Sequence, residues 1–194
     1  MNFNYQKARD LMVENQLRPN KIKDPVLLNL FRKKPKETFL PENTGSLSYL
    51  DMDITLSQNR GYLKNLHIAQ LIKHAEINSN HKVLHIGALT GYVTSLISDL
   101  CFKVIAIEED NQHRIKLKNN IKNNQIKNVE ILDESFREGS YLKAPFDRIL
   151  IDCPIINFNE KLLDQLSDNL GQIIMIEKGQ DNLSKAIKIT KNNF

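Results

Sequence analysis

The chain has 194 residues, of which 41% are hydrophobic and 26% are charged, and its formal net charge is +4. This composition excludes an intrinsically disordered chain and suffices for one domain with a buried core. No apolar run approaches the roughly 20 residues that a membrane-spanning helix needs, and the first residues lack the apolar stretch of a signal peptide. We therefore expect a soluble chain with no membrane partner.

Cysteine usage and charge distribution restrict the compartment and the partners. Cys101 and Cys153 are two thiols without metal-ligand spacing, so we predict reduced cysteines, no metal site and a cytoplasmic location. Basic residues cluster within 21–36 and 114–127, but solvated faces usually account for such clusters. Nucleic-acid binding calls for a stronger basic stripe with interleaved aromatic residues, so we do not expect a nucleic-acid partner.

The first 64 residues are expected to form a helical and loop region. Apolar residues at helical spacing predict two helices within residues 1–35, and Asp24 and Pro25 supply an N-cap and a first-turn proline for the second. The loops that follow are marked by Pro35, Pro41 and Gly45. Residues 65–76 predict a further helix.

A regular alternation of strands and helices comes next. The expected strands are 83–87, 103–107, 129–132, 148–151 and 172–176. The expected helices between them are 91–99, 110–123 and 159–168. This alternation predicts an α/β fold with a doubly wound, mostly parallel, Rossmann-like sheet over residues 65–194, and residues 183–190 are expected to begin an edge strand. Residues 1–194 are assigned to a single domain.

The turn after the first expected strand is typical of a nucleotide site. Val83-Leu84-His85-Ile86 runs into a tight turn bounded by Gly87 and Gly91, and a helix follows. Such a turn places backbone N–H groups and the positive end of the helix dipole beside a bound ligand. Two residues depart from the usual pattern, since Leu89 replaces a central glycine and His85 stands where many such strands carry an acid.

An acid on the second strand restricts the cofactor. Glu108 follows Gly87 by 21 residues. From this position, roughly 20 residues past the turn, an acid accepts hydrogen bonds from both hydroxyls of a ribose, which suits NAD, FAD and S-adenosylmethionine. A dinucleotide pyrophosphate needs a central and a third glycine, and this chain has neither. S-adenosylmethionine carries no phosphate, so the residues favour it.

Several ordered segments of the chain follow one known family pattern. Three of its patterns match residues 12–18, 22–27 and 35–42, in this order: M-V-x-x-Q-L, I-x-D-x-x-V-L and V-P-R-x-x-F-V-P-E. Two further patterns match residues 144–151 and 162–173, in this order: A-P-[FY]-D-x-I-x-V and L-x-x-Q-L-x-x-G-G-x-[LI]. From about residue 5 to residue 178 the chain therefore resembles the protein-L-isoaspartate O-methyltransferases.

This resemblance implies a class I methyltransferase fold with S-adenosylmethionine as cofactor. The implied reaction is methyl transfer to the abnormal carboxylate of L-isoaspartyl residues in damaged proteins, so the partner would be a protein or peptide carrying isoaspartate. We expect a monomer. The implied cofactor-binding residues are His85, Gly87, Ala88, Thr90, Gly91, Glu108 and Glu109, with Asp133 or Glu134 near the adenine.

The family's serine before the cofactor turn has no matching serine here. Counting back from Gly87 without gaps places Leu63 at that position, whereas Ser57 matches only after a six-residue shift. We favour the gapless register, in which Ser57 is a turn residue, and keep Ser57 and Asp152 as candidate catalytic residues. Asp152 ends the fourth strand and faces the same cleft, where it could position the substrate amide or cap the next segment.

Three functions remain open at this point. A substrate carboxylate with a pKa of about 4 is already ionised at neutral pH. An isoaspartate methyltransferase without the serine therefore has to align the carboxylate oxygen with the methyl group and needs no general base. His85 and Leu89 favour a degenerate member that binds cofactor or protein with little activity. Residues 152–155 faintly resemble [DN]-P-P-[FY], which favours another substrate such as RNA. The family also adds strands beyond the position of Phe194, so we expect an incomplete sheet edge.

Overall fold

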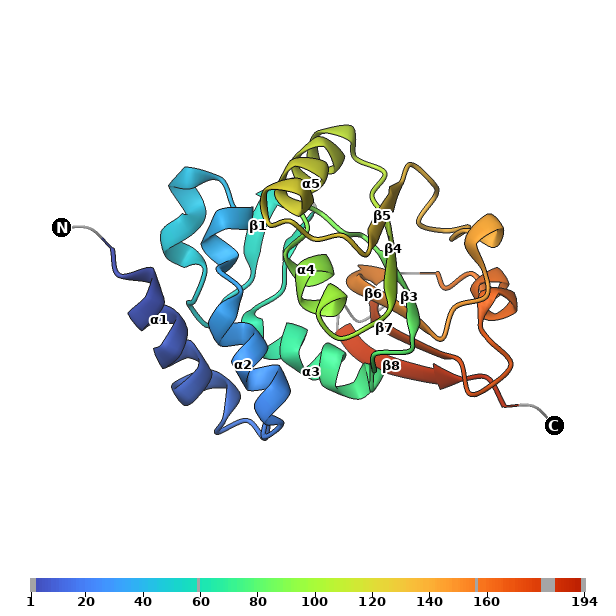
Figure 1. The fold of residues 1–194 in the computed structure, drawn as a ribbon, viewed down its shortest axis with the longest axis horizontal. Coiled ribbons are helices and arrows are strands. Elements are labelled where there is room, and N and C mark those ends of the chain that lie inside the picture. Colours follow the sequence, from blue (N-terminus) through green and yellow to red (C-terminus); the bar gives the residue numbers. More distant parts are fainter. Residues whose placement is uncertain (1–2, 59, 156, 179–183, 193–194) are drawn as a thin grey trace.

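The computed structural model describes residues 3–58, 60–155, 157–178 and 184–192, and its centre is a six-stranded sheet (Figure 1). In spatial order the strands are β5 (Val129–Leu132), β4 (Lys103–Ile107), β3 (Lys82–Ile86), β6 (Arg148–Ile155), β7 (Gln172–Lys178) and β8 (Ser184–Thr190). The first five strands in this order are parallel to one another, and β8 pairs antiparallel with β7. The predicted doubly wound, mostly parallel sheet is confirmed, and so is the edge strand, although residue 183 lies outside the described residues.

The central strands are apolar runs because the sheet is covered on both faces. In β3 and β4 every residue after the first lysine is buried. Parallel sheets covered on both faces favour such continuous runs over alternation. The chain moves from β3 outward to β5 and then returns to place β6 on the other side of β3. This reversal of strand order leaves a crevice at the carboxyl ends of β3 and its neighbours, where α/β sheets bind their ligands.

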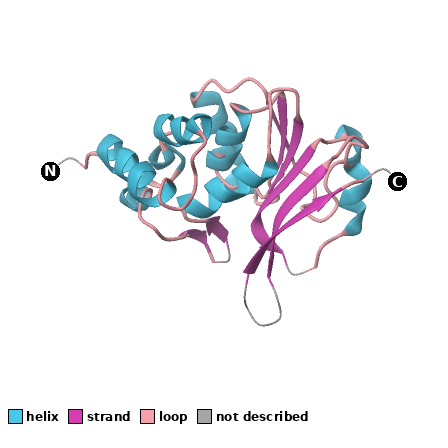
Figure 2. Cartoon of the chain, turned by 90° about the horizontal axis from the view of Figure 1, so that it is seen from below, coloured by secondary structure: helices cyan, strands magenta, loops and turns pink. Residues whose placement is uncertain are grey.

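Helices cover the two faces of the sheet unequally (Figures 1 and 2). One face carries α3 (Asn65–Ala75), α4 (Tyr92–Ser98) and α5 (Asn111–Asn123), whose apolar residues share a core with the N-terminal region. The other face carries the short helices η4 (Tyr141–Lys143) and η5 (Glu160–Gln165), and Leu162 and Leu166 pack there against the sheet. Among the described residues, no helix is long and apolar enough to cross a membrane.

The predicted helix over residues 159–168 is wrong, because the structure has only the six-residue 3-10 helix η5 there. Its end is fixed by backbone pairing with Phe146. The Phe146 N–H donates to the Gln165 carbonyl, and the Ser167 N–H donates to the Phe146 carbonyl, both at 2.8 Å. A strand-like connection at this point prevents the chain from continuing as a helix.

The N-terminal region is helical as predicted in its described part. It consists of α1 (Tyr5–Met12), the π-helical turn η1 (Val13–Leu17), α2 (Pro25–Lys33), η2 (Lys36–Phe39) and η3 (Glu42–Leu47). The Asp24 side chain caps α2 by accepting a hydrogen bond from the Val26 N–H at 2.8 Å. Buried apolar residues of α1 and α2 join the core formed by α3 to α5. The assignment of residues 1–194 to a single domain stays a prediction.

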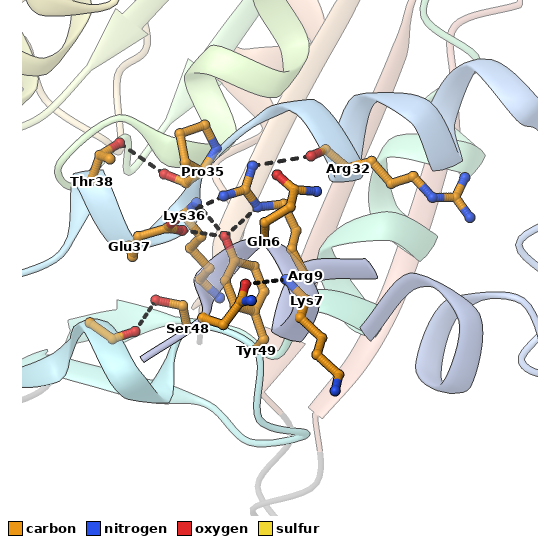
Figure 3. A network of polar contacts seen from close by, with 12 residues as sticks. Gln6, Lys7, Arg9, Arg32, Pro35, Lys36, Glu37, Thr38, Ser48 and Tyr49 are labelled. Carbon is orange, nitrogen blue, oxygen red and sulfur yellow. Dashed lines mark hydrogen bonds and ion pairs between the residues drawn. The ribbon is translucent and has the colours of Figure 1, made fainter. Parts of the chain in front are cut away.

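A polar network joins α1, η2 and the segment after η3 (Figure 3). The guanidinium of Arg9 donates to the Tyr49 hydroxyl at 2.9 Å and to Glu37 at 2.8 Å. The Tyr49 hydroxyl donates in turn to Glu37 and accepts from the Lys36 N–H at 3.0 Å. Three separate segments are thereby fixed around one buried phenol.

A short hairpin links the N-terminal region to α3. It is formed by β1 (Ile54–Ser57) and β2 (Arg60–Tyr62), which pair antiparallel. Only loops are predicted here from the sequence, because four- and three-residue strands are too short to show a period. The buried Tyr62 hydroxyl bonds to Thr90 (2.8 Å) and accepts from the Tyr92 N–H (3.0 Å), so the hairpin is attached to the start of α4.

Candidate active site

The glycine turn between β3 and α4 is tight, with positive φ at Gly87 (+86°) and Gly91 (+99°). Most of its N–H groups bond within the protein. Those of Gly87 and Ala88 both donate to one strand carbonyl at 3.1 Å, and that of Leu89 donates to Glu108 at 2.7 Å. A turn whose donors are used in this way is not a phosphate cradle, which agrees with the preference for a cofactor without phosphate.

The side chains of the turn face the protein interior. Ala88, Leu89 and Thr90 are all at most 3% exposed, and Leu89 packs in the core although its φ is +50°. The Thr90 hydroxyl donates to the Phe39 carbonyl at 2.6 Å and also bonds to Tyr62. Thr90 therefore joins the turn to the N-terminal region and the hairpin.

Glu108 lies at the carboxyl end of β4, as predicted. It is fully buried, and donors occupy every acceptor position of its carboxylate. The two Nη atoms of Arg60 donate to its two oxygens at 2.6 and 2.9 Å. Backbone N–H groups of Leu89 (2.7 Å) and Asp110 (3.0 Å) donate one further bond to each oxygen. A carboxylate has about four lone-pair positions, so all of them are used.

Arg60 reaches this position from β2 and lies across the glycine turn. Its guanidinium stacks on the ring of Phe136, 4.8 Å from the centroid. Its Nη2 would be 3.6 Å from a Cβ on Gly87, which is ordinary van der Waals contact, so the guanidinium lies next to the glycine. Burial lowers the pKa of Arg60, but the hydrogen bonds and charge of Glu108 outweigh burial and raise it above its ordinary value.

His85 and Asp152 face each other across two neighbouring strands. His85 pairs in register with Leu150, and Asp152 lies two residues further along β6, so both side chains are on one face. Both are buried, and their Nε2 and Oδ1 atoms are 3.5 Å apart, with no hydrogen-bond partner for either atom among the described residues. The other ring nitrogen of His85 bonds to the Thr94 hydroxyl at 2.9 Å.

The three acids after β4 and β5 have different surroundings. Glu109 accepts a hydrogen bond from the Phe136 N–H at 2.6 Å and so fixes the loop that carries this ring. Asp133 pairs with Arg114 at 2.8 Å, and 69% of its side chain is exposed. Glu134 has a buried Oε2 with no partner within the described part of the chain. Their roles toward a cofactor stay predictions.

A groove of about 400 Å³ opens at the carboxyl ends of β3 and β6, beside the Arg60–Glu108 pair. It is lined by Arg60, Gly61, Ile86, Phe136, Arg137, Ile151, Cys153, Ile155, Asn157, Asn159 and Leu162. Burial, followed by the charge of Asp152, raises the pKa of Cys153 to about 12, so this thiol is protonated near neutral pH and is not a nucleophile there.

The two candidate positions for a serine lie at opposite ends of the hairpin. Ser57 is exposed and directly opposite Arg60 in the β1–β2 register. Leu63 follows β2 and lines a second cavity, of about 620 Å³, between α3 and the β7–β8 pair. Which of the two positions corresponds to the family's serine stays a prediction. Within the described ranges, no cluster of three or more His, Cys, Asp or Glu residues could hold a metal ion.

Two residues of the candidate site, Arg60 and Phe136, were not predicted from the sequence. Neither belongs to a motif with a recognisable spacing, and both depend on connections outside the strand-helix alternation. Arg60 is a lone arginine within a short polar stretch, 48 residues before Glu108, and this pattern does not indicate a pair. Buried carboxylates are almost always paired, but the sequence cannot identify the partner.

Comparison with known proteins decides the family. Residues 6–193 match the family described as protein-L-isoaspartate(D-aspartate) O-methyltransferase (PCMT). The chain belongs to this family. A relative of that name from Methanosarcina mazei is 31% identical over 191 residues, which cover 97% of this chain and 76% of the relative. One from Methanoculleus marisnigri is 26% identical over 185 residues, covering 95% of this chain and 83% of the relative.

Solved structures of this family share the fold of the chain. A structure named protein-L-isoaspartate O-methyltransferase has a TM-score of 0.80 at 17% identity, covering 97% of this chain and 60% of that one. A Plasmodium falciparum structure that carries the same family name also has a TM-score of 0.80, at 19% identity, covering 99% of this chain and 92% of that one. That structure is a complex with S-adenosyl-L-homocysteine. The class I methyltransferase fold is thereby confirmed for this PCMT-family chain.

Proposed function

We propose that this PCMT-family chain methylates the carboxylate of L-isoaspartyl residues in damaged proteins, with S-adenosylmethionine as the methyl donor. The observation that carries the proposal is a family match over residues 6–193 together with a groove at the carboxyl ends of β3 and β6, whose lining includes Arg60, the partner of the buried Glu108. A protein or peptide carrying isoaspartate is the partner. The monomeric state and the cytoplasmic location stay predictions.

The groove residues fit a nucleoside-containing cofactor. The volume of the groove, about 400 Å³, lies within the range of about 300–1,000 Å³ usual for small-molecule sites. Phe136 offers a ring face on which a purine can stack, and Ile86 and Ile151 provide apolar walls. Glu108 is the acceptor for the two ribose hydroxyls once the Arg60 guanidinium has moved off it.

Asp152 compensates for the acid that β3 lacks. An ammonium group on the methionine end requires a buried acceptor, and His85 is not one. The unpartnered Asp152 Oδ1 is 3.7 Å from the position of a Cβ on Gly87, so it faces the bare backbone of the turn. We assign Asp152 to the cofactor's ammonium, with His85 Nε2 beside its Oδ1 at 3.5 Å.

The chemistry asks little of the protein beyond alignment. When bound, the cofactor supplies a methyl group on a positively charged sulfur. The substrate carboxylate, with an ordinary pKa of about 4, is ionised at neutral pH, so no residue has to remove a proton. The chain's contribution is to hold the carboxylate oxygen in line with the methyl group and the sulfur and to exclude water from the apolar groove.

Calorimetric titration with S-adenosylhomocysteine tests the proposal most simply. We expect saturable binding with one site per chain, weakened by Asp152→Asn. The degenerate-member alternative is favoured by one observation, the saturation of Glu108 by Arg60. If this pair never opens, no heat of binding will be seen at millimolar ligand, and the enzyme proposal fails.

A further inference from the structure

We propose that Arg60 binds the carboxylate of the substrate, and that its pair with Glu108 is the resting position from which the cofactor releases it. This inference rests on the proposed function. In the chain without cofactor, both Nη atoms of Arg60 already donate to the carboxylate of Glu108, at 2.6 and 2.9 Å. This parallel two-bond geometry is how arginine recognises free carboxylates, and an ammonium group cannot reproduce it.

The cofactor's ribose has to displace Arg60 from Glu108. All four acceptor positions of this carboxylate are used, two by Arg60 and two by backbone N–H groups. The backbone donors of Leu89 and Asp110 are fixed by the turn and by the start of α5, whereas Arg60 is a side chain on a three-residue strand. Two ribose hydroxyls need two acceptors, so they exchange for the two Arg60 bonds.

The released guanidinium stays in the groove and requires a new anion. In its pair with Glu108 the Arg60 side chain is only 21% exposed and stacks on Phe136 beside Gly87 and Cys153, so a short movement off Glu108 keeps it within the groove. A partly buried guanidinium without a partner is unfavourable, because it has lost water without gaining hydrogen bonds. The substrate of the proposed reaction is itself a carboxylate, and it would restore the pair at the place where the methyl group is delivered.

Binding to Arg60 leaves the substrate oxygen able to react. The two Nη donors use two lone pairs of the carboxylate, and the others stay available. One of these forms the O–CH₃ bond while the S–CH₃ bond breaks and its electron pair remains on sulfur, so no proton and no further reactant is needed. The product is a neutral ester, which no longer pairs with Arg60, and this favours its release.

The test is Arg60→Gln, with Arg32→Gln as the matched control. Arg32 also pairs with a glutamate, Glu14, in the N-terminal region, and its side chain is similarly exposed at 28%. Two measurements are made on each variant: calorimetric binding of S-adenosylhomocysteine, and methylation kinetics with a short peptide containing one L-isoaspartyl residue. Arg60→Lys serves as a conservative third variant, since it keeps the charge and loses the two-bond geometry.

For Arg60→Gln we expect KM for the peptide to rise about 10- to 100-fold, the change that loss of charge-assisted hydrogen bonds corresponds to. Binding of S-adenosylhomocysteine should be unchanged or tighter, because Glu108 no longer has to lose a partner. Arg60→Lys should have an intermediate KM and Arg32→Gln an unaltered one. In the unsubstituted chain, the peptide should bind measurably only when S-adenosylhomocysteine is present.

Three results would overturn the inference. An unaltered KM in Arg60→Gln means that Arg60 does not bind the substrate. Loss of S-adenosylhomocysteine binding in that variant means that Arg60 only supports Glu108. If the unsubstituted chain neither binds S-adenosylhomocysteine nor methylates the peptide, the proposed function fails and the inference fails with it. Binding and turnover by the unsubstituted chain, with an unaltered KM in the variant, refutes the role of Arg60 alone.

Discussion

Lys36 is a fully buried lysine whose charge makes the stability of the fold dependent on pH. Its ammonium donates to Asn65 at 3.1 Å and lies 5.5 and 5.4 Å from the ring centroids of Tyr62 and Tyr92. Burial lowers the pKa of Lys36 to about 7, and the charge of Asp53 opposes this only in part. In the unfolded chain the same group keeps its ordinary pKa of about 10.4.

The direction of the effect follows from proton binding. Between pH 7 and about pH 10 the unfolded state holds a proton on Lys36 that the folded state has released, so the free energy of unfolding rises with pH. From pH 7 to about 8.5 the gain from this group is about 1.5 kcal/mol, because the folded lysine changes from about half protonated to almost neutral. Below pH 7 the cost of burying the charge is present and nearly constant.

Urea unfolding at several pH values between about 7 and 8.5 measures this slope, with Lys36→Met as the reference. Methionine fills similar space without a titrating group, and the contributions of all other residues cancel in the difference. We expect the unsubstituted chain to gain about 1.5 kcal/mol more than the variant over this interval. Parallel slopes would refute the reasoning, and so would a steeper slope in the variant. If Lys36→Met does not fold, Lys36→Leu provides the same comparison.

Three further predictions concern single residues. Gly91→Ala should lower the free energy of unfolding in urea by about 1–3 kcal/mol, because φ is +99° and the new Cβ would be 2.7 Å from a Leu117 methyl; an unchanged midpoint contradicts this. Asp152→Asn should weaken S-adenosylhomocysteine about tenfold in calorimetry, with thermal stability retained, and equal affinity would remove Asp152 from the ammonium site. Tyr49→Phe should cost about 1–3 kcal/mol in urea, because Arg9 and a backbone N–H lose their buried acceptor, whereas a neutral result would mean that water replaces the hydroxyl.

The sequence was sufficient for the elements that have a strong local period or a cap. The run from Val104 to Ile107 is apolar because β4 is covered on both faces, and Asp24 precedes a proline that starts α2. The helix predicted over 159–168 was wrong because its end depends on backbone pairing with Phe146, a contact from a distant segment. The hairpin β1–β2 was missed for a similar reason, since its strands are held by Tyr62 and the start of α4 rather than by their own pattern.

Half of the site was predictable from the sequence. The glycine turn and Glu108 follow from spacing along one strand-turn-helix unit, so the sequence located both. The proposed role of Asp152 depends on β6 lying beside the strand that carries His85, and this requires knowledge of strand order. Arg60 was not predictable, because nothing in residues 57–62 indicates that this side chain crosses to the end of β4.

Transfer of a labelled methyl group from S-adenosylmethionine tests the central claim most directly. The unsubstituted chain is incubated with a peptide containing one L-isoaspartyl residue, with its normal aspartyl counterpart and with an RNA control. We predict base-labile label in the isoaspartyl peptide alone, because a methyl ester forms on its free carboxylate. Label in the RNA only, equal label in both peptides, or no label in any sample would contradict the claim.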